Sequence, residues 1–327
     1  MKGMKMRLGK ILVCWMAAFV FSGAINAQEQ KVSAAFSLKE KPLVAEGIAY
    51  DKEAGVFYIG SIYKKKIIRA DLNGTASDFK GEREDGLMDV LGMKIDGARR
   101  ILWVCSYAGG GYERDKGSAG IFKYDLRTGR LIKKYIAGGK NGSHLFNDIA
   151  IKDNGDIFFT DSEDSRIYSI KTGKDIIEEF FPPGILKYPN GIVLSPDEKY
   201  LFVADNEGIH RIDMKGRRIL LKVPGGTTAG GCDGICFYGN SIVAVQNEHT
   251  PEQIVRFYLN ENFDVIEKIE ILCANNPLIA IPTTGAVAGD EFFIIGNSQL
   301  DLIKEGKITA PEKAEETRIV RIPLRQP

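Results

Sequence analysis

The chain has 327 residues, of which 44 are basic and 43 acidic, so its formal net charge is only +1. Like charges are scattered rather than gathered in blocks, which argues against a nucleic-acid or membrane-surface partner. The five cysteines show no paired Cys-x-x-Cys or histidine cluster, which argues against a structural zinc site.

The N-terminus has the pattern of a secretory signal peptide, which we assign to residues 1–27. Four basic residues precede an apolar run, residues 11–21, that ends in small residues, and cleavage could follow Ala24 or Ala27. The run is well short of the roughly 20 residues of a membrane-spanning helix. Cys14 lies inside the run rather than after it, which argues against a lipid anchor. We therefore expect an exported protein, periplasmic or secreted, without a membrane span.

The rest of the chain, residues 28–327, contains a sixfold repeat. Each repeat opens with a residue pair followed by an apolar strand, and the openings are 45, 56, 43, 43 and 51 residues apart. The pairs are Glu46-Gly47, Leu91-Gly92, Asn147-Asp148, Asn190-Gly191, Asp233-Gly234 and Thr284-Gly285. A period of this length indicates a propeller or a solenoid.

Within each repeat, a turn rich in Gly, Asp, Asn or Pro leads into a second apolar strand, and polar turns then lead to a third and a fourth. The second strands are expected at residues 56–60, 101–105, 157–160, 201–204, 242–245 and 292–295. Four short strands per repeat predict an all-β, six-bladed β-propeller in a single domain. A surplus strand near residues 32–38 is expected to pair with the last blade and close the ring. Two β-sandwich domains would also give many short strands, but they would not require one signature six times.

The opening residues of a propeller's innermost strands stand at the mouth of its central channel. Two carboxylates and two carboxamides should meet there: Glu46, Asn147, Asn190 and Asp233. Two buried carboxylates repel each other unless a cation lies between them. Because all four side chains offer hard oxygen ligands, the pattern predicts Ca²⁺, with Mg²⁺ or Mn²⁺ as alternatives. Asn-Gly and Asp-Gly are also common turn formers, so the prediction rests on their equivalent positions in the repeat.

Four ordered motifs resemble those of the senescence marker protein-30/gluconolactonase family, and more distantly those of paraoxonases and strictosidine-synthase-like propellers. They are Glu46-Gly47, Phe146-Asn147-Asp148, Pro189-Asn190-Gly191 followed by Ser195-Pro196-Asp197, and Cys232-Asp233-Gly234. The resemblance implies a six-bladed propeller that binds calcium or a similar ion through Glu46, Asn190 and Asp233, with Asn147 at the metal or the substrate. It also implies hydrolysis of lactones or related esters. Gluconolactonase-type members carry an arginine that contacts the sugar where this chain has Leu145, so the resemblance does not extend to sugar-lactone specificity.

In such a hydrolase the ion would polarise the substrate carbonyl. Asp233 is the preferred base for the attacking water, and Asp148 and His144 are alternatives, because a histidine three residues before Asn147 should lie on the same rim. Loops that follow the second strands should contact a small-molecule substrate. The rim candidates are Tyr107, Arg114, Asp205, Asn247 and His249.

A second function remains open at this point: a non-catalytic secreted propeller whose metal is structural and whose top face binds a small ligand or a protein. A fold alone does not separate these two classes. The cysteines Cys105, Cys232, Cys236 and Cys273 are expected either as buried thiols or with one disulfide. The sequence does not predict an oligomeric state.

Overall fold

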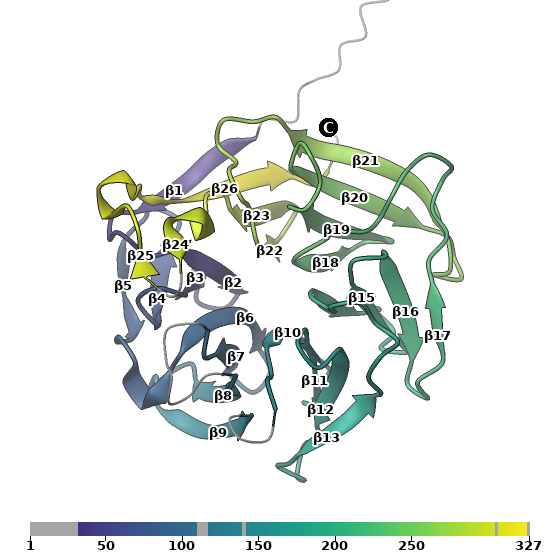
Figure 1. Ribbon diagram of the computed structural model, residues 1–327, viewed down its shortest axis with the longest axis horizontal. Coiled ribbons are helices and arrows are strands. Elements are labelled where there is room, and N and C mark those ends of the chain that lie inside the picture. The colour runs from purple at the N-terminus through teal and green to yellow at the C-terminus, as the bar shows by residue number, and fades with distance from the viewer. Residues whose placement is uncertain (1–31, 110–116, 139–141, 305–306, 326–327) are drawn as a thin grey trace, which may run out of the picture.

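The computed structural model describes residues 32–109, 117–138, 142–304 and 307–325. These residues form six antiparallel four-stranded sheets arranged as blades around a central channel (Figure 1). The predicted six-bladed β-propeller is thereby confirmed. The predicted signal peptide lies outside the described residues. Among the described residues, no helix is long and apolar enough to cross a membrane.

Five blades are built from consecutive strands that run in order from the channel outwards. Blade 1 comprises β2 (Ala45–Asp51), β3 (Val56–Ser61), β4 (Lys66–Asp71) and β5 (Ala76–Lys80). Blade 2 comprises β6 (Asp89–Asp96), β7 (Ile101–Tyr107), β8 (Ala119–Asp125) and β9 (Leu131–Ala137). Blade 3 comprises β10 (Phe146–Ile151), β11 (Ile157–Asp161), β12 (Arg166–Ile170) and β13 (Ile177–Phe181). Blade 4 comprises β14 (Ile192–Leu194), β15 (Tyr200–Ala204), β16 (Ile209–Asp213) and β17 (Arg218–Leu220). Blade 5 comprises β18 (Ile235–Tyr238), β19 (Ser241–Gln246), β20 (Gln253–Leu259) and β21 (Ile266–Ala274).

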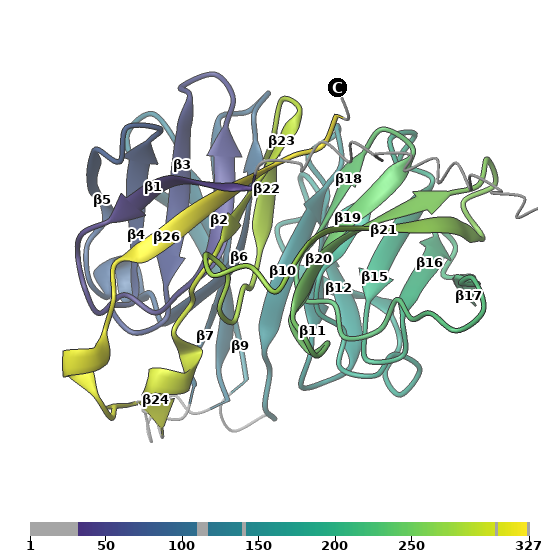
Figure 2. The same ribbon diagram turned by 90° about the horizontal axis from the view of Figure 1, so that it is seen from above.

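Blade 6 combines the two ends of the described chain. Its strands, from the channel outwards, are β22 (Gly285–Ala288), β23 (Glu291–Ile295), β26 (Thr317–Pro323) and β1 (Ser33–Leu38). β1 pairs antiparallel with β26 from Ser33–Arg321 to Leu38–Thr317, and Figures 1 and 2 show the two strands side by side. The predicted ring closure is thus confirmed, and it covers an edge of β26 that would otherwise be open to pairing.

Small elements decorate the connections between strands. They are the strands β24 (Ile303–Lys304) and β25 (Lys307–Ile308), and the 3-10 helices η1 (Glu84–Gly86), η2 (Leu300–Leu302) and η3 (Pro311–Lys313). Figures 1 and 2 show that β24 and β25 project from one face of the ring. This is the face to which the loops after the second strands return, and it is called the rim face below.

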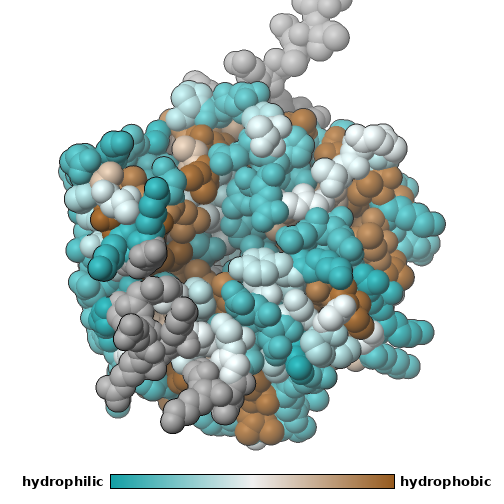
Figure 3. All heavy atoms as spheres, viewed as in Figure 1, coloured by the Kyte–Doolittle hydropathy of each residue, from teal (hydrophilic) through white to brown (hydrophobic). Residues whose placement is uncertain are grey.

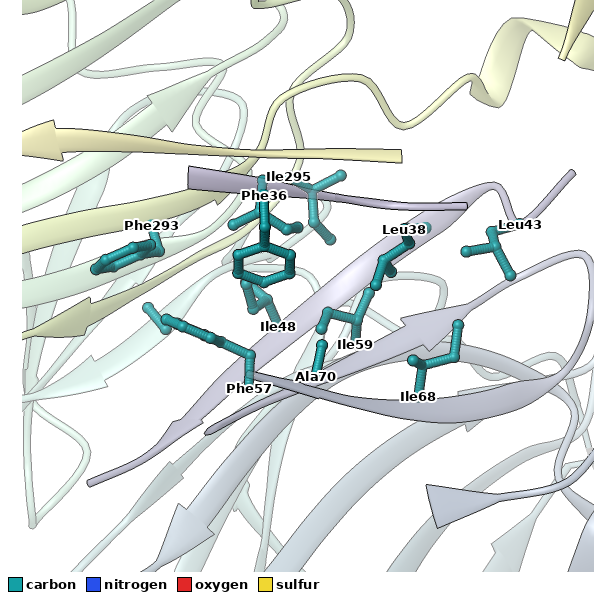
Figure 4. Packing of buried hydrophobic residues seen from close by; sticks show 13 residues of the cluster. Phe36, Leu38, Leu43, Ile48, Phe57, Ile59, Ile68, Ala70, Phe293 and Ile295 are labelled. Carbon is teal, nitrogen blue, oxygen red and sulfur yellow. The ribbon is translucent and has the colours of Figure 1, made fainter. Parts of the chain in front are cut away.

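The hydrophobic core lies between neighbouring blades. Inner strands such as β3 are buried along their whole length, whereas the outermost strand β5 is largely exposed. Between blades 6 and 1, the ring of Phe57 packs 4.8 Å from that of Phe293 and 5.6 Å from that of Phe36, centroid to centroid (Figure 4). Aromatic pairs at such distances contribute beyond the area they bury. Each blade is therefore stabilised by its neighbours rather than by a core of its own.

The four cysteines in the described residues are all buried and form no disulfide. Of the two arrangements left open by the sequence, the structure has the free thiols.

Candidate metal centre

The six innermost strands contact one another in order around the channel (Figure 1). In blades 1 to 3 the pairing with the second strand shifts register at the signature, for example between Ala45 and Ile48. In blades 4 and 5 the signature lies just before the strand, since β14 begins at Ile192 and β18 at Ile235. The signature pairs therefore form β-bulges or strand entrances rather than regular strand positions. Bulges free a side chain from the pleat and re-aim it, and they are common beside functional sites.

The glycines of the signature are required by close contact between blades. A Cβ atom on Gly47 would lie 1.9 Å from the carbonyl oxygen of Leu91, and one on Gly191 would lie 2.3 Å from that of Asp233. Neither glycine has a positive φ, so neither serves as a turn former. The signature instead packs each blade against the opening residue of the next.

Glu46 and Asp233 are buried at the channel mouth, with exposed fractions of 6% and 7%. Glu46 Oε2 and Asp233 Oδ1 are both buried and have no hydrogen-bond partner among the described residues. Burial raises the pKa of Glu46 well above its usual range, and the charges of Asp233 and Asp148 raise it further. Burial also raises the pKa of Asp233 to about 7, although hydrogen bonds from Asn247 and Asn190 oppose the rise. A cation held between these carboxylates would remove both the repulsion and the unsatisfied oxygens.

Neighbouring groups hold the side chain of Asn147 and the backbone of Asn190. Asn147 Nδ2 donates to Ser162 Oγ at 3.0 Å, and Ser162 Oγ donates to the Pro189 carbonyl at 2.6 Å. This chain of hydrogen bonds leaves Asn147 Oδ1 for another partner. The backbone carbonyl of Asn190 accepts a hydrogen bond from Thr160 Oγ1 at 2.7 Å. The donors that hold both asparagines come from β11 and the residue that follows it, so blade 3 also positions the neighbouring blade.

Below the mouth, Asp148 and Lys94 line one cavity of about 10 Å³. Asp148 Oδ2 accepts the backbone N–H of Ile192 at 3.2 Å. Burial alone would lower the pKa of Lys94, but Asp148, Cys236 and Cys105 together outweigh it, and the pKa lies above its usual range. The cavity has space for about one water at most. Asp148, predicted as an alternative base, therefore lies in a small enclosed cavity below the channel mouth. Lys94 was not predicted from the sequence, although it is the only charged residue at the fourth position of the repeats.

His144 is paired with a buried carboxylate. Its Nδ1 lies 2.6 Å from Asp161 Oδ2, while Asp161 Oδ1 accepts the backbone N–H groups of Leu145 and Asp164. Because Nδ1 faces Asp161, Nε2 is the ring nitrogen left to exchange a proton. Asp164 is close enough for the three side chains to share an ion. Its carboxylate, however, already pairs with Arg166 Nε at 2.7 Å, so a second metal is not needed there.

Asp205 lies in a different environment from the predicted substrate rim. Its buried carboxylate accepts the backbone N–H groups of Lys187, Glu207 and Gly208, and it pairs with His210 Nε2 at 2.8 Å. These contacts tie the connection between β15 and β16 to the segment that precedes β14. The structure therefore gives Asp205 a role in holding blade 4. Arg114 lies outside the described residues.

Asn247 joins the channel mouth to a groove of about 570 Å³ on the rim face. Its Nδ2 donates to Asp233 Oδ2 at 2.7 Å and to the Pro282 carbonyl at 3.0 Å. His249 also lines the groove, together with Thr250, Pro251, Glu252, Asn275, Asn276, Pro277 and Ile279. Tyr107 is half-buried at the end of β7. Hydrophilic residues cover most of the face seen in Figure 3. The structure thus brings Asn247 and His249 together beside the channel.

Comparison with known proteins gives one family and several similar structures. The model of the SMP-30/Gluconolactonase/LRE-like region matches residues 44–274, which span blades 1 to 5. A comparison with curated proteins found no match.

Three solved structures share the fold at low sequence identity. A gluconolactonase from Xanthomonas campestris is 16% identical, with 88% of this chain and 89% of that one covered and a TM-score of 0.60. A PQQ-bound aldose sugar dehydrogenase from Streptomyces coelicolor is 13% identical, with 89% and 98% covered and a TM-score of 0.58. A virginiamycin B lyase from Staphylococcus aureus is 22% identical, with 81% and 82% covered and a TM-score of 0.56. These three proteins differ in activity and are all less than 25% identical to this chain, so the likenesses show the fold alone.

Proposed function

The chain belongs to the SMP-30/gluconolactonase/LRE-like family, and on that premise we propose that it is an exported, metal-dependent hydrolase of lactones or related esters. The observation that carries the proposal is the pair of buried carboxylate oxygens, Glu46 Oε2 and Asp233 Oδ1, that lack a hydrogen-bond partner among the described residues. Unsatisfied buried anions are costly, and a bound cation is the simplest group that would satisfy both.

Glu46, Asn147, Asn190 and Asp233 would hold the ion. Carboxylate and amide oxygens suit Ca²⁺, with Mg²⁺ or Mn²⁺ as alternatives. When bound, the ion would supply Lewis-acid polarisation of the substrate carbonyl. Ser162 would keep Asn147 Oδ1 available by binding its Nδ2. Asn247 would hold Asp233 in place through Oδ2, leaving Oδ1 for the ion.

Two groups are suited to take the proton from the attacking water. Asp233 borders the mouth of the channel and remains our first choice. His144 is the second, because Asp161 fixes its ring and would stabilise the imidazolium formed when Nε2 accepts a proton. His144→Gln distinguishes them, because it leaves the four proposed ligands intact: loss of the rate with the ion still bound would identify His144 as the base, whereas an unchanged rate would leave Asp233.

The groove beside Asn247 would hold the part of the substrate that extends from the reacting carbonyl. Its lining mixes amide, hydroxyl and imidazole groups and the carboxylate of Glu252 with two prolines and Ile279. Leu145 is buried and offers no charge. We therefore propose a lactone or ester whose remote part is polar and carries no negative charge. The groove, rather than an arginine at position 145, would select it.

Metal analysis and a substrate panel test the proposal together. We expect one divalent ion per chain, and hydrolysis of small lactones or aryl esters that EDTA abolishes and Ca²⁺ restores. Glu46→Gln should lose the ion and lower the rate by roughly 100-fold or more. Glu261→Gln is the matched control, because that side chain is exposed and belongs to neither group of side chains that could hold an ion. Ion binding without turnover on any substrate would favour the non-catalytic propeller. Full activity in Glu46→Gln would refute the metal site.

A further inference from the structure

Two charged residues interrupt the repeat just inside the channel. The second signature position is glycine in five repeats and Asp148 in the third. The fourth position is Ala, Val or Cys in five repeats and Lys94 in the second. Each substitution alone would place an isolated charge in a narrow, buried space, which is costly. Their occurrence in adjacent blades indicates that one compensates the other.

The structure brings these two residues together beneath the candidate metal ligands. Lys94 and Asp148 line the same 10 Å³ cavity, whose remaining walls are Gly92, Gly234, Gly285, Thr284 and the apolar residues Ile48, Met93 and Ile235. Among those lining residues, Lys94 is the only one that carries a positive charge. Asp148 directly follows Asn147, a proposed ligand, and its charge raises the pKa values of Glu46 and Asp233. Lys94 therefore shares a cavity with a carboxylate whose charge acts on the residues at the mouth.

The sum of these charges matches a divalent ion. Glu46, Asp148 and Asp233 together carry −3 when ionised, Lys94 carries +1, and a divalent cation would bring the total to zero. We propose that Lys94 is a built-in counter-cation that acts through Asp148 to set how tightly the channel binds its divalent ion. This inference rests on the proposed metal site, and it makes Lys94 a positioning residue. A nucleophilic role is not compatible with the cavity, which is too small to admit a substrate carbonyl beside the ammonium group.

Ion affinity measured by calorimetry at pH 8 tests the inference without any assay of activity. Removing a nearby positive charge should strengthen cation binding, so Lys94→Met should bind Ca²⁺ about tenfold tighter than wild type. Asp148→Asn should bind it about tenfold more weakly, and the double variant should return close to wild type. Lys215→Met is the control, since this lysine is exposed on blade 4 and should leave the affinity unchanged.

The wild type and its variants separate the possible failures. Lys94→Met could fail to fold without the ion, because it leaves the buried Asp148 carboxylate unpaired. In that case the effect of removing Lys94 is measured as the difference in Ca²⁺ affinity between Asp148→Asn and the double variant, both of which lack that carboxylate. The inference would be overturned if removing Lys94 failed to strengthen Ca²⁺ binding both in the wild-type protein and in Asp148→Asn, with all variants folded. A wild-type protein that binds no divalent ion would instead overturn the metal proposal on which it rests.

Discussion

At the scale of single residues, the candidate site depends on carboxylates that the fold alone does not satisfy. Asp233 has one oxygen held by Asn247 and one without a partner among the described residues. Glu46 is buried beside it, and each charge makes the other harder to ionise. The protonation of these side chains should therefore respond to whether an ion is present. This predicts a pH dependence of stability that differs between the metal-free and metal-bound protein.

In the metal-free protein, the pKa of Asp233 is about 7 in the folded state, against an ordinary value of 3.8. Between these values the folded state binds more protons than the unfolded state. The free energy of unfolding should therefore fall as pH rises from about 4 to about 7, and stay lower above. Asp233→Asn removes the titrating group and therefore this loss. The free energy of unfolding of the variant minus that of wild type should thus be larger at pH 8 than at pH 4, by on the order of 3 kcal/mol. Urea unfolding in EDTA at the two pH values measures this change. An equal difference between the proteins at both pH values would contradict it, and saturating Ca²⁺ should abolish the gain.

At the scale of elements, the signature joins one blade to the next. Gly191 N–H donates to the Asp233 carbonyl at 3.1 Å, and Thr284 Oγ1 donates to the Glu46 carbonyl at 2.5 Å. Contacts of this kind link the opening residues of blades 4, 5, 6 and 1. The innermost strands thus form a continuous wall in which a Cβ atom added at Gly47, Gly92 or Gly191 would meet the backbone of the next blade. Backbone cannot move aside as a flexible side chain can.

Gly191→Ala should therefore destabilise the protein by about 3 kcal/mol, because the new Cβ would meet the Asp233 carbonyl at 2.3 Å. It should also weaken ion binding, since Asp233 must shift to relieve the contact. Gly225→Ala is the matched control: no atom lies within 4 Å of its added Cβ, and its φ is not positive. That change should leave the stability within about 1 kcal/mol of wild type. Chemical unfolding of both variants measures the contrast. Equal stabilities would show that the blade junction can adjust.

The repeat predicted these elements because equivalent residues of a propeller occupy equivalent places. Glu46 and Asp233, 187 positions apart in the sequence, could be assigned to one channel on that ground alone. The bulges were not predictable, since they depend on a register shift between strands. Asp205 was expected on the rim because, like Asn247, it directly follows the second strand of its blade. The backbone N–H groups that bind it come from the following turn and from Lys187, and the sequence does not specify the shape of either segment. Lys94 was missed because the repeat was recognised from the first two residues of each opening strand. The lysine lies at the fourth position, outside that pair.

At the scale of the whole molecule, stability depends on closing the ring. β1 and β26 pair although 279 residues separate the end of one from the start of the other, Leu38 from Thr317. Until they meet, blade 6 lacks its outermost strand and blade 1 lacks part of its apolar wall. Phe36 of β1 is 7% exposed and packs against Phe57 of blade 1. Since every blade is stabilised by its neighbours, loss of this contact should destabilise the other blades as well.

Phe36→Ala tests that cooperativity, using the protein without residues 1–27. The change should lower the free energy of unfolding by about 3 kcal/mol through the lost burial and the cavity left behind. Trp103, the only tryptophan in residues 28–327, lies buried in blade 2, away from β1 in Figure 1. If the ring unfolds as one unit, its fluorescence should report the same shift in urea midpoint as far-UV circular dichroism. Ile271→Ala, at a side chain that is 60% exposed, should shift neither signal appreciably. A shift seen by circular dichroism but not by Trp103 would mean that the blades unfold separately. The channel would then not depend on ring closure for its geometry.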